Sequence, residues 1–268
     1  MWGRIWAMTA LLGLAACASS PAPPGQQAPH LPVKQSGSGS PTVVFEAGAG
    51  EKLDTWDLVQ PGISQLTRTF AYTRRGYAGA PALAHRDALT IVEELRALLR
   101  EQRLPPPYLL VGHSIGGLYM QVFAKTYPDE VAGVVLVDTS HPDQLERMKA
   151  ERHGNYLLAK TLMMTLGAAS TAGAEMRGIT ESRKQWHAAG PWPDVPMILL
   201  SAQRDTALNG HEFTAFFQNL QRELVASWPG AELRAVDSDH FVQRNRPQDV
   251  VQAIRDVLAR ARAVRPVS

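Results

Sequence analysis

The chain has 268 residues, of which 45% are hydrophobic, and this composition provides enough apolar material for one large core and argues against general disorder. Its 27 basic and 25 acidic side chains give a formal net charge of +2, and the two signs are mixed along the chain, so a nucleic-acid-binding protein is not indicated. We therefore expect a single α/β domain whose partner is a small molecule, with no nucleic acid involved.

The first residues have the layout of an export signal. Arg4 precedes an apolar run over 5–16, which is too short to cross a membrane and is followed at once by a polar, proline-rich stretch. The sequence LAAC, ending at Cys17, resembles the bacterial lipobox, in which the cysteine is lipidated. Cys17 is the one cysteine of the chain and can form no internal disulfide, which favours an anchoring role. Alternatively, the A-C-A sequence at 16–18 is an ordinary signal-peptidase site and would release a soluble periplasmic product.

These features divide the chain into three parts. We expect a signal peptide with a lipobox over 1–17, a flexible tether over 18–40 and a folded domain over 41–268. The tether is rich in proline, serine, glycine and glutamine, a composition typical of linkers. An edge strand near 31–35 is the alternative for its last part. Anchored at Cys17, the domain would face the periplasm at the bacterial cell envelope.

From residue 42 onward, short β-branched runs alternate with amphipathic stretches, which predicts βαβ units and a mostly parallel sheet. Helices are predicted over 88–102 and 249–261, where apolar residues recur on one face. The expected strands are 42–46, 68–73, 108–111, 131–138, 197–202 and 231–236.

No strand is apparent between residues 139 and 195. The run over 141–169 reads as a helix, and glycine, tryptophan and proline then interrupt the pattern. A long helical insertion in a regular α/β pattern is usually functional, so we interpret 139–195 as a helical cap over a site. A purely structural insertion is the alternative.

The glycines and serine at Gly112, Ser114 and Gly116 fit the pattern G-x-S-x-G, between an apolar run and a helical stretch. In this pattern a strand turns sharply into a helix and exposes the serine on a strained bend. A serine hydroxyl is a poor nucleophile near neutral pH, so it needs a base, an acid that orients the base, and N–H donors for an oxyanion. The sequence thus predicts Ser114 as a nucleophile, with an ordinary glycine-rich turn as the alternative.

A candidate base, His240, follows the last predicted strand and precedes a helix that Pro247 would open. With this histidine and the serine motif, the chain resembles the α/β-hydrolase superfamily, whose members often end in a small residue and His, then an apolar residue, Pro and an amphipathic helix. Asp239 stands where the small residue is usual. The resemblance covers about 42–262 and implies the α/β-hydrolase fold, a mostly parallel sheet flanked by helices.

Two positions are open for the acid that orients His240. Asp205 follows the strand over 197–202, which is the usual position in the superfamily. Asp138 ends the strand that follows the nucleophile helix, a position that some members use. We favour Asp205 because it gives the usual chain order of Ser, Asp and His, and we keep Asp138 as the alternative.

The expected oxyanion hole combines two backbone N–H groups. One belongs to Ile115, directly after the nucleophile, and the other comes from the loop EAGAGEK that follows the strand over 42–46. This loop resembles the His-Gly-x position of the superfamily, which places the second donor at Ala49, with Ala47 in place of the histidine.

The stretch AYTRRGYAGAP at 71–81 resembles another motif of the superfamily, the D-R-x-G-x-G-x-S turn. Arg74 and Gly76 match this motif, whereas Thr73 replaces its aspartate. The resemblance implies that this turn supports the nucleophile region structurally.

Together these features predict a serine hydrolase that cleaves a carboxylic ester or related acyl bond through an acyl-enzyme on Ser114. We expect no cofactor and no metal, since no pair of histidines has metal-ligand spacing. Three alternatives remain: a cofactor-free haloperoxidase or C–C bond hydrolase with the same triad, a non-catalytic lipid-anchored binding protein on the same scaffold, and a membrane-surface lipase.

Overall fold

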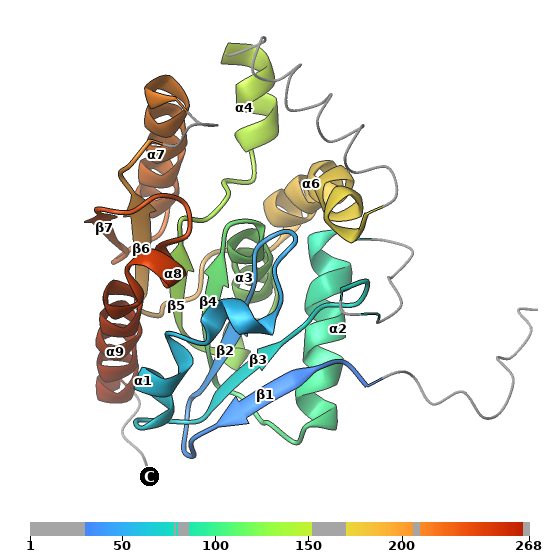
Figure 1. The fold of residues 1–268 in the computed structure, drawn as a ribbon, viewed down its shortest axis with the longest axis vertical. Coiled ribbons are helices and arrows are strands. Elements are labelled where there is room, and N and C mark those ends of the chain that lie inside the picture. The colour runs from blue at the N-terminus through green and yellow to red at the C-terminus, as the bar shows by residue number, and fades with distance from the viewer. Residues whose placement is uncertain (1–29, 78, 80–85, 152–169, 206–209, 265–268) are drawn as a thin grey trace, which may run out of the picture.

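The computed structural model describes residues 30–77, 79, 86–151, 170–205 and 210–264. In this part of the chain a seven-stranded sheet lies between helices on its two faces (Figure 1). The strand order is β1-β3-β2-β4-β5-β6-β7, and every neighbouring pair is parallel except β1 with β3. The predicted fold class, a mostly parallel sheet flanked by helices, is confirmed.

The strands are β1 (Val33–Ser36), β2 (Thr42–Glu46), β3 (Thr69–Tyr72), β4 (Tyr108–His113), β5 (Val131–Val137), β6 (Met197–Ala202) and β7 (Glu232–Val236). The described helices are the 3-10 helices η1 (Leu53–Trp56) and η2 (Pro128–Glu130), and α1 (Gln60–Ser64), α2 (Ala88–Glu101), α3 (Ile115–Thr126), α4 (Gln144–Glu151), α6 (Thr171–Ala188), α7 (His211–Ala226), α8 (Val242–Asn245) and α9 (Pro247–Val264). None of the helices in these residues combines the length and apolarity needed to cross a membrane.

The central strands β2, β4 and β5 are buried along their whole length, because helices cover both faces of the sheet. Alternate residues enter opposite cores, as the pleat of a strand requires. Val44 packs in the core beneath α2 and α3, whereas Val43 and Phe45 pack in the core that contains α9. These uninterrupted apolar runs made the strands visible in the sequence, and the six expected strands all form.

Strand β1 lies inside the segment expected to be a tether. It pairs antiparallel with β3, with Val33 opposite Tyr72 and Ser36 opposite Thr69. Leu31, just before it, is buried in the core. Residues 33–36 therefore belong to the sheet, and the folded domain begins before residue 41. This strand corresponds to the alternative given for the last part of the tether, an edge strand near 31–35, and not to the preferred reading of a tether up to residue 40.

The segment between β5 and β6 is only partly as expected. Helix α4 lies within the predicted helical run over 141–169, whose residues 152–169 are outside the described part. Helix α6 lies within the expected helical cap over 139–195 but beyond the run that was predicted as a helix, and Ser170 caps its first turn by accepting a hydrogen bond from the Gly173 N–H. Helix α6 packs against α2 and α3, and α4 and α6 lie beyond the carboxyl ends of the strands (Figure 1).

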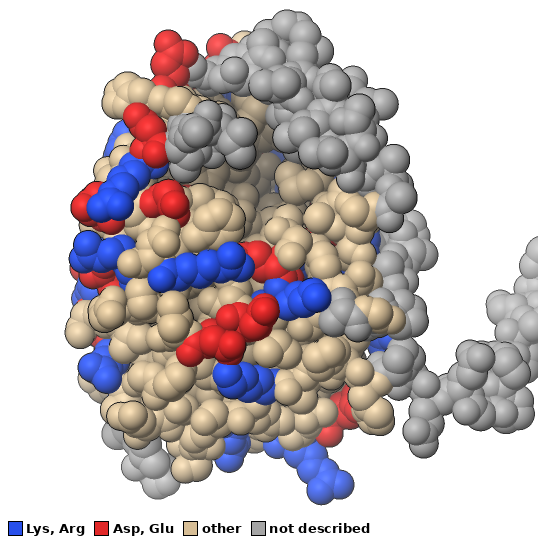
Figure 2. All heavy atoms as spheres, viewed as in Figure 1, with Lys and Arg blue, Asp and Glu red and all other residues tan. Residues whose placement is uncertain are grey.

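Charged side chains of both signs intermix on the face shown in Figure 2, and the lysines and arginines drawn there form no continuous basic stripe. This distribution agrees with the mixed charge pattern of the sequence.

Candidate active site

The serine of the G-x-S-x-G motif lies on the sharp bend between β4 and α3. Ser114 has φ +55° and ψ −123°, a conformation that costs a non-glycine residue about 1–3 kcal/mol. Backbone hydrogen bonds hold the bend: the Ser114 N–H donates to the carbonyl oxygen of Val137 at 3.1 Å, and its own carbonyl accepts from the N–H groups of Gly117 and Ser140 at 3.0 Å each. The strand–turn–helix context expected for Ser114 is therefore present.

The glycines of the motif permit close contacts between backbone segments. A Cβ atom on Gly112 would lie 2.7 Å from the carbonyl oxygen of Gly116, where the helix folds back on the strand. A Cβ atom on Gly116 would lie 2.4 Å from the carbonyl oxygen of Ala47, in the loop after β2. Both distances are too short for any side chain. The motif thus brings the start of α3 against the loop that carries the expected oxyanion donor.

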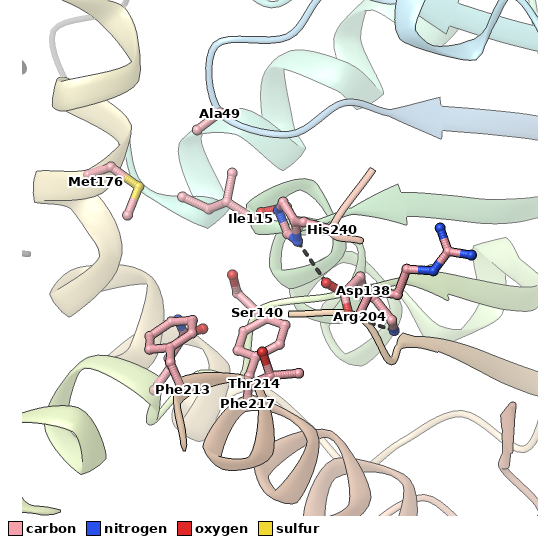
Figure 3. A pocket seen from close by; sticks show the side chains of 13 residues that line it. Ala49, Ile115, Asp138, Ser140, Met176, Arg204, Phe213, Thr214, Phe217 and His240 are labelled. Carbon is pink, nitrogen blue, oxygen red and sulfur yellow. Dashed lines mark hydrogen bonds and ion pairs between the residues drawn. The ribbon is translucent and has the colours of Figure 1, made fainter. Parts of the chain in front are cut away.

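The imidazole of His240, in the loop after β7, meets a carboxylate that follows β5. Its Nδ1 lies 2.7 Å from Oδ2 of Asp138 (Figure 3). Asp138 is buried, and its Oδ1 accepts hydrogen bonds from the Ala202 N–H at 3.0 Å and from Nε2 of Gln221 at 2.9 Å. The carboxylate is therefore fixed, and it places the hydrogen of a neutral His240 on Nδ1, which leaves the Nε2 lone pair available as a base.

Asp205, the preferred acid, does not reach His240. Its carboxylate lies 3.5 Å from Nδ1 of His211, and both side chains are largely exposed. The chain after β6 stays paired with the segment after β7, since the N–H of Gln203 donates to Val236 O and that of Arg204 to Ser238 O. Beyond this pairing, the Asp205 carboxylate lies toward His211 and not toward His240. The preference for Asp205 is therefore incorrect, and the alternative residue, Asp138, is the partner of the imidazole.

The two expected oxyanion donors line the pocket that also contains Ser114 and His240. Ile115 is the first residue of α3, so its N–H has no partner within the helix. Among the hydrogen bonds of the described residues, none uses the N–H of Ile115 or of Ala49. Both groups are thus available to a ligand oxygen at the carboxyl edge of the sheet.

Apolar side chains from two helices line the pocket: α6, which lies in the expected cap over 139–195, and α7, which was not predicted. Met176 comes from α6, and Phe213 and Phe217 come from one face of α7 (Figure 3). The four-residue spacing of the phenylalanines was the available signal in the sequence. Polar groups also line the pocket, namely Ser140, Gln144, Arg204 and Thr214.

A buried pair of side chains, His113 and Glu51, lies beside these groups. His113, the residue before the nucleophile, has Nδ1 2.6 Å from Glu51 Oε2 and Nε2 2.9 Å from the carbonyl oxygen of His240. Glu51 Oε2 and the carbonyl oxygen of His240 are both acceptors, so each contact uses a hydrogen on the ring nitrogen that faces it. Burial raises the pKa of Glu51, but hydrogen bonds from His113, the Thr55 hydroxyl and the Gly48 N–H outweigh it and lower that pKa to about 2. His113 thus ties the histidine loop to the loop after β2.

Comparisons with known proteins place this chain among hydrolases. The curated relatives include the "Uncharacterized protein YqjL" of Bacillus subtilis (strain 168), 28% identical over 227 residues that cover 83% of this chain and 85% of that protein. They also include the esterase Rv0045c of Mycobacterium tuberculosis, 30% identical over 135 residues that cover 49% of this chain and 45% of that protein. A solved esterase from Exiguobacterium antarcticum has a TM-score of 0.62 at 15% identity and covers 85% of this chain and 95% of its own.

The model of one protein family, described as "Alpha/beta hydrolase family", matches residues 43–253. This match includes the serine bend, Asp138 and His240, and it spans most of the chain. The protein therefore belongs to the alpha/beta hydrolase family.

Proposed function

We propose that the protein is a serine hydrolase that cleaves a carboxylic ester or a related acyl bond through an acyl-enzyme on Ser114. The observation that carries this proposal is the 2.7 Å hydrogen bond between His240 Nδ1 and Asp138 Oδ2, in the same pocket as the strained serine. Such a pair supplies the oriented base that a serine hydroxyl needs.

In the proposed reaction, Ser114 Oγ attacks the acyl carbon while His240 Nε2 takes the hydroxyl proton. The carbonyl oxygen becomes an oxyanion, which accepts hydrogen bonds from the N–H groups of Ile115 and Ala49. The imidazolium, stabilised by Asp138, gives its proton to the departing alcohol. Water then attacks the acyl-enzyme, His240 takes a proton from it, and the acid leaves as the proton returns to Ser114.

The lining of the pocket supports an apolar group next to the scissile bond. The thioether of Met176 and the rings of Phe213 and Phe217 provide adaptable and flat apolar surfaces. Esters with an aliphatic or aromatic acyl part are therefore the proposed substrate class.

A fluorophosphonate probe and a panel of p-nitrophenyl esters of increasing acyl length test this function. We expect the wild type to be labelled and to hydrolyse the esters, and Ser114→Ala to lose both properties. Ser64→Ala is the control and should keep both properties, because the Ser64 hydroxyl donates to the carbonyl oxygen of Pro61 within its own helix turn. Labelling that persists in Ser114→Ala, or a wild type that is never labelled, would contradict the proposal.

We also propose that Cys17 anchors the protein through a lipid to the bacterial cell envelope, facing the periplasm. Support comes from the LAAC sequence; Cys17 lies outside the described residues. Globomycin, which blocks lipoprotein signal cleavage, should block processing, and Cys17→Ser should abolish membrane retention. If processing is unchanged by globomycin and by Cys17→Ser, ordinary signal cleavage and a soluble periplasmic product are favoured.

A further inference from the structure

Arg74, which follows β3, is a fully buried cation beside the loop that carries Ala49. Its Nη1 donates to Glu46 Oε1 and to the carbonyl oxygen of Ala47, each at 2.6 Å. Its Nη2 donates to the carbonyl oxygen of Gly48 at 2.8 Å and to Glu175 Oε2 at 2.9 Å, and its Nε donates to Glu175 Oε1 at 2.8 Å. The five N–H bonds of the guanidinium thus have five acceptors, so the group can hardly move.

The hydrogen bond to Gly48 sets the direction of the Ala49 N–H. A peptide unit is planar and trans, so the C=O of Gly48 and the N–H of Ala49 point in opposite directions. Since Arg74 holds the oxygen, the N–H is turned away from the guanidinium. The preceding peptide is held at both ends, because Arg74 binds the carbonyl of Ala47 and Glu51 accepts from the Gly48 N–H at 2.9 Å.

Two buried arginines and two buried glutamates form one cluster. Arg74 pairs with Glu46 and Glu175, Arg86 pairs with Glu175, and all four side chains are at most 1% exposed. Burial raises the pKa of Glu46 by more than Arg74 and the Tyr72 hydroxyl lower it. Burial raises the pKa of Glu175, but the charges and hydrogen bonds of Arg74 and Arg86 outweigh it and keep that pKa low. A change that removes one charge would leave another buried without a partner, which makes conservative substitutions the useful ones.

Glu175 connects this cluster to the substrate pocket. It belongs to α6, and the next residue, Met176, lines the pocket that Ser114 and Ala49 also line (Figure 3 shows Met176 and Ala49). One turn of α6 therefore supplies both a side chain that lines the pocket and the carboxylate that accepts hydrogen bonds from the guanidinium. The position of α6 is thereby fixed relative to the loop over 47–49 through two side chains.

We propose that Arg74 is a positioning residue that aims the Ala49 N–H at the oxyanion, and that Glu175 fixes α6 to this donor. The proposal rests on the serine-hydrolase function proposed above. In this proposal Arg74 does more than support the turn after β3, because it fixes the orientation of the Ala49 N–H before the reaction begins. An N–H held in this way acts mainly when charge develops on the substrate oxygen, so its loss lowers kcat more than it raises KM.

The test is Arg74→Lys, which keeps the charge but cannot supply the planar fork. We expect kcat for a p-nitrophenyl ester to fall by about 10- to 100-fold, while KM stays within about threefold. Affinity for a boronic acid, whose serine adduct places a negative oxygen in the oxyanion hole, should fall by a similar factor. Arg86→Lys is the matched control, because Arg86 is equally buried and binds Glu175 but makes no contact with the Ala47 or Gly48 carbonyls; its kcat should stay within about threefold.

Circular dichroism and thermal unfolding establish that each variant is folded. If Arg74→Lys does not fold, Glu175→Asp serves instead, since it keeps the charge but shortens the side chain that holds the guanidinium, and it should lower kcat in the same direction. A folded Arg74→Lys with kcat and boronic-acid affinity within twofold of the wild type overturns the proposal, as does an equal loss in Arg86→Lys. Failure of the wild type to react with a fluorophosphonate is a separate result, which overturns the serine-hydrolase function itself.

Discussion

Replacing Asp138 with asparagine tests the assignment of the acid most directly. The substitution keeps the size of the side chain but changes one acceptor into a donor. In the wild type, Oδ1 of Asp138 accepts from Ala202 and Gln221, and Oδ2 accepts from His240. Of the two amide orientations, the one that keeps the oxygen facing Ala202 and Gln221 is favoured. The opposite orientation would turn an NH₂ group toward two donors and leave buried groups unpaired, at a cost of about 1–3 kcal/mol each.

The favoured orientation places the new NH₂ group against His240. The imidazole must then accept through Nδ1 and carry its hydrogen on Nε2, so it can no longer take the serine proton. Tautomer reversal of this kind costs about 10⁴-fold in kcat in the serine-protease triad, which corresponds to about 5 kcal/mol of barrier. We expect a loss of about 10³- to 10⁴-fold in kcat for Asp138→Asn, with little change in fold, because its remaining hydrogen bonds persist.

The assay is kcat and KM on a p-nitrophenyl ester, together with the rate of fluorophosphonate labelling. Asp205→Asn is the matched control; its exposed carboxylate pairs only loosely with His211, so kcat should stay within about twofold of the wild type. The reasoning is refuted if Asp205→Asn loses orders of magnitude while Asp138→Asn remains active.

Two further predictions concern the loop after β2 and its neighbours. Gly116→Ala should lower the free energy of unfolding by about 1–3 kcal/mol because its Cβ would lie 2.4 Å from Ala47 O. Gly210→Ala, whose added Cβ would have no atom of the described residues within 4 Å, should change it by under about 0.5 kcal/mol in urea melts. The pKa of Glu51 is lowered from 4.5 to about 2 in the folded protein. The stability that the ionised Glu51 contributes to the fold is therefore complete above about pH 4.5 and is lost as the pH falls through about 2. The stability advantage of wild type over Glu51→Gln should therefore shrink by about 3 kcal/mol between pH 5 and 2, and a constant difference would contradict this.

Much of the fold and the serine bend could be predicted because their signals are local. Strands β2, β4 and β5 are buried on both faces and read as short apolar runs. Gly112 is required by its contact with Gly116 inside the same short motif, so the bend is marked by neighbouring residues of the sequence. His240 was found in the same way, from its position between the last strand and a helix that begins at Pro247.

The helices that wall the pocket were harder to predict. Helix α6 buries polar side chains such as Glu175 and Ser182, which weakens its apolar stripe. Their partners are distant in the chain: Arg74 lies 101 residues from Glu175. No spacing rule predicts such a pair, because only the packing of α6 against α2 and α3 brings these side chains together.

The choice between Asp138 and Asp205 shows where the sequence stops being sufficient. The sequence by itself determined the sheet, the strained Ser114 and the histidine that follows the last strand. It could not choose the acid, because each aspartate follows a strand and satisfies the same local pattern. The tertiary structure decided the acid, because β5 lies directly beside β4 and because the chain after β6 stays paired with the chain after β7. Proximity to an imidazole depends on strand order and on the path of one loop, and neither is encoded in the residues next to the aspartate.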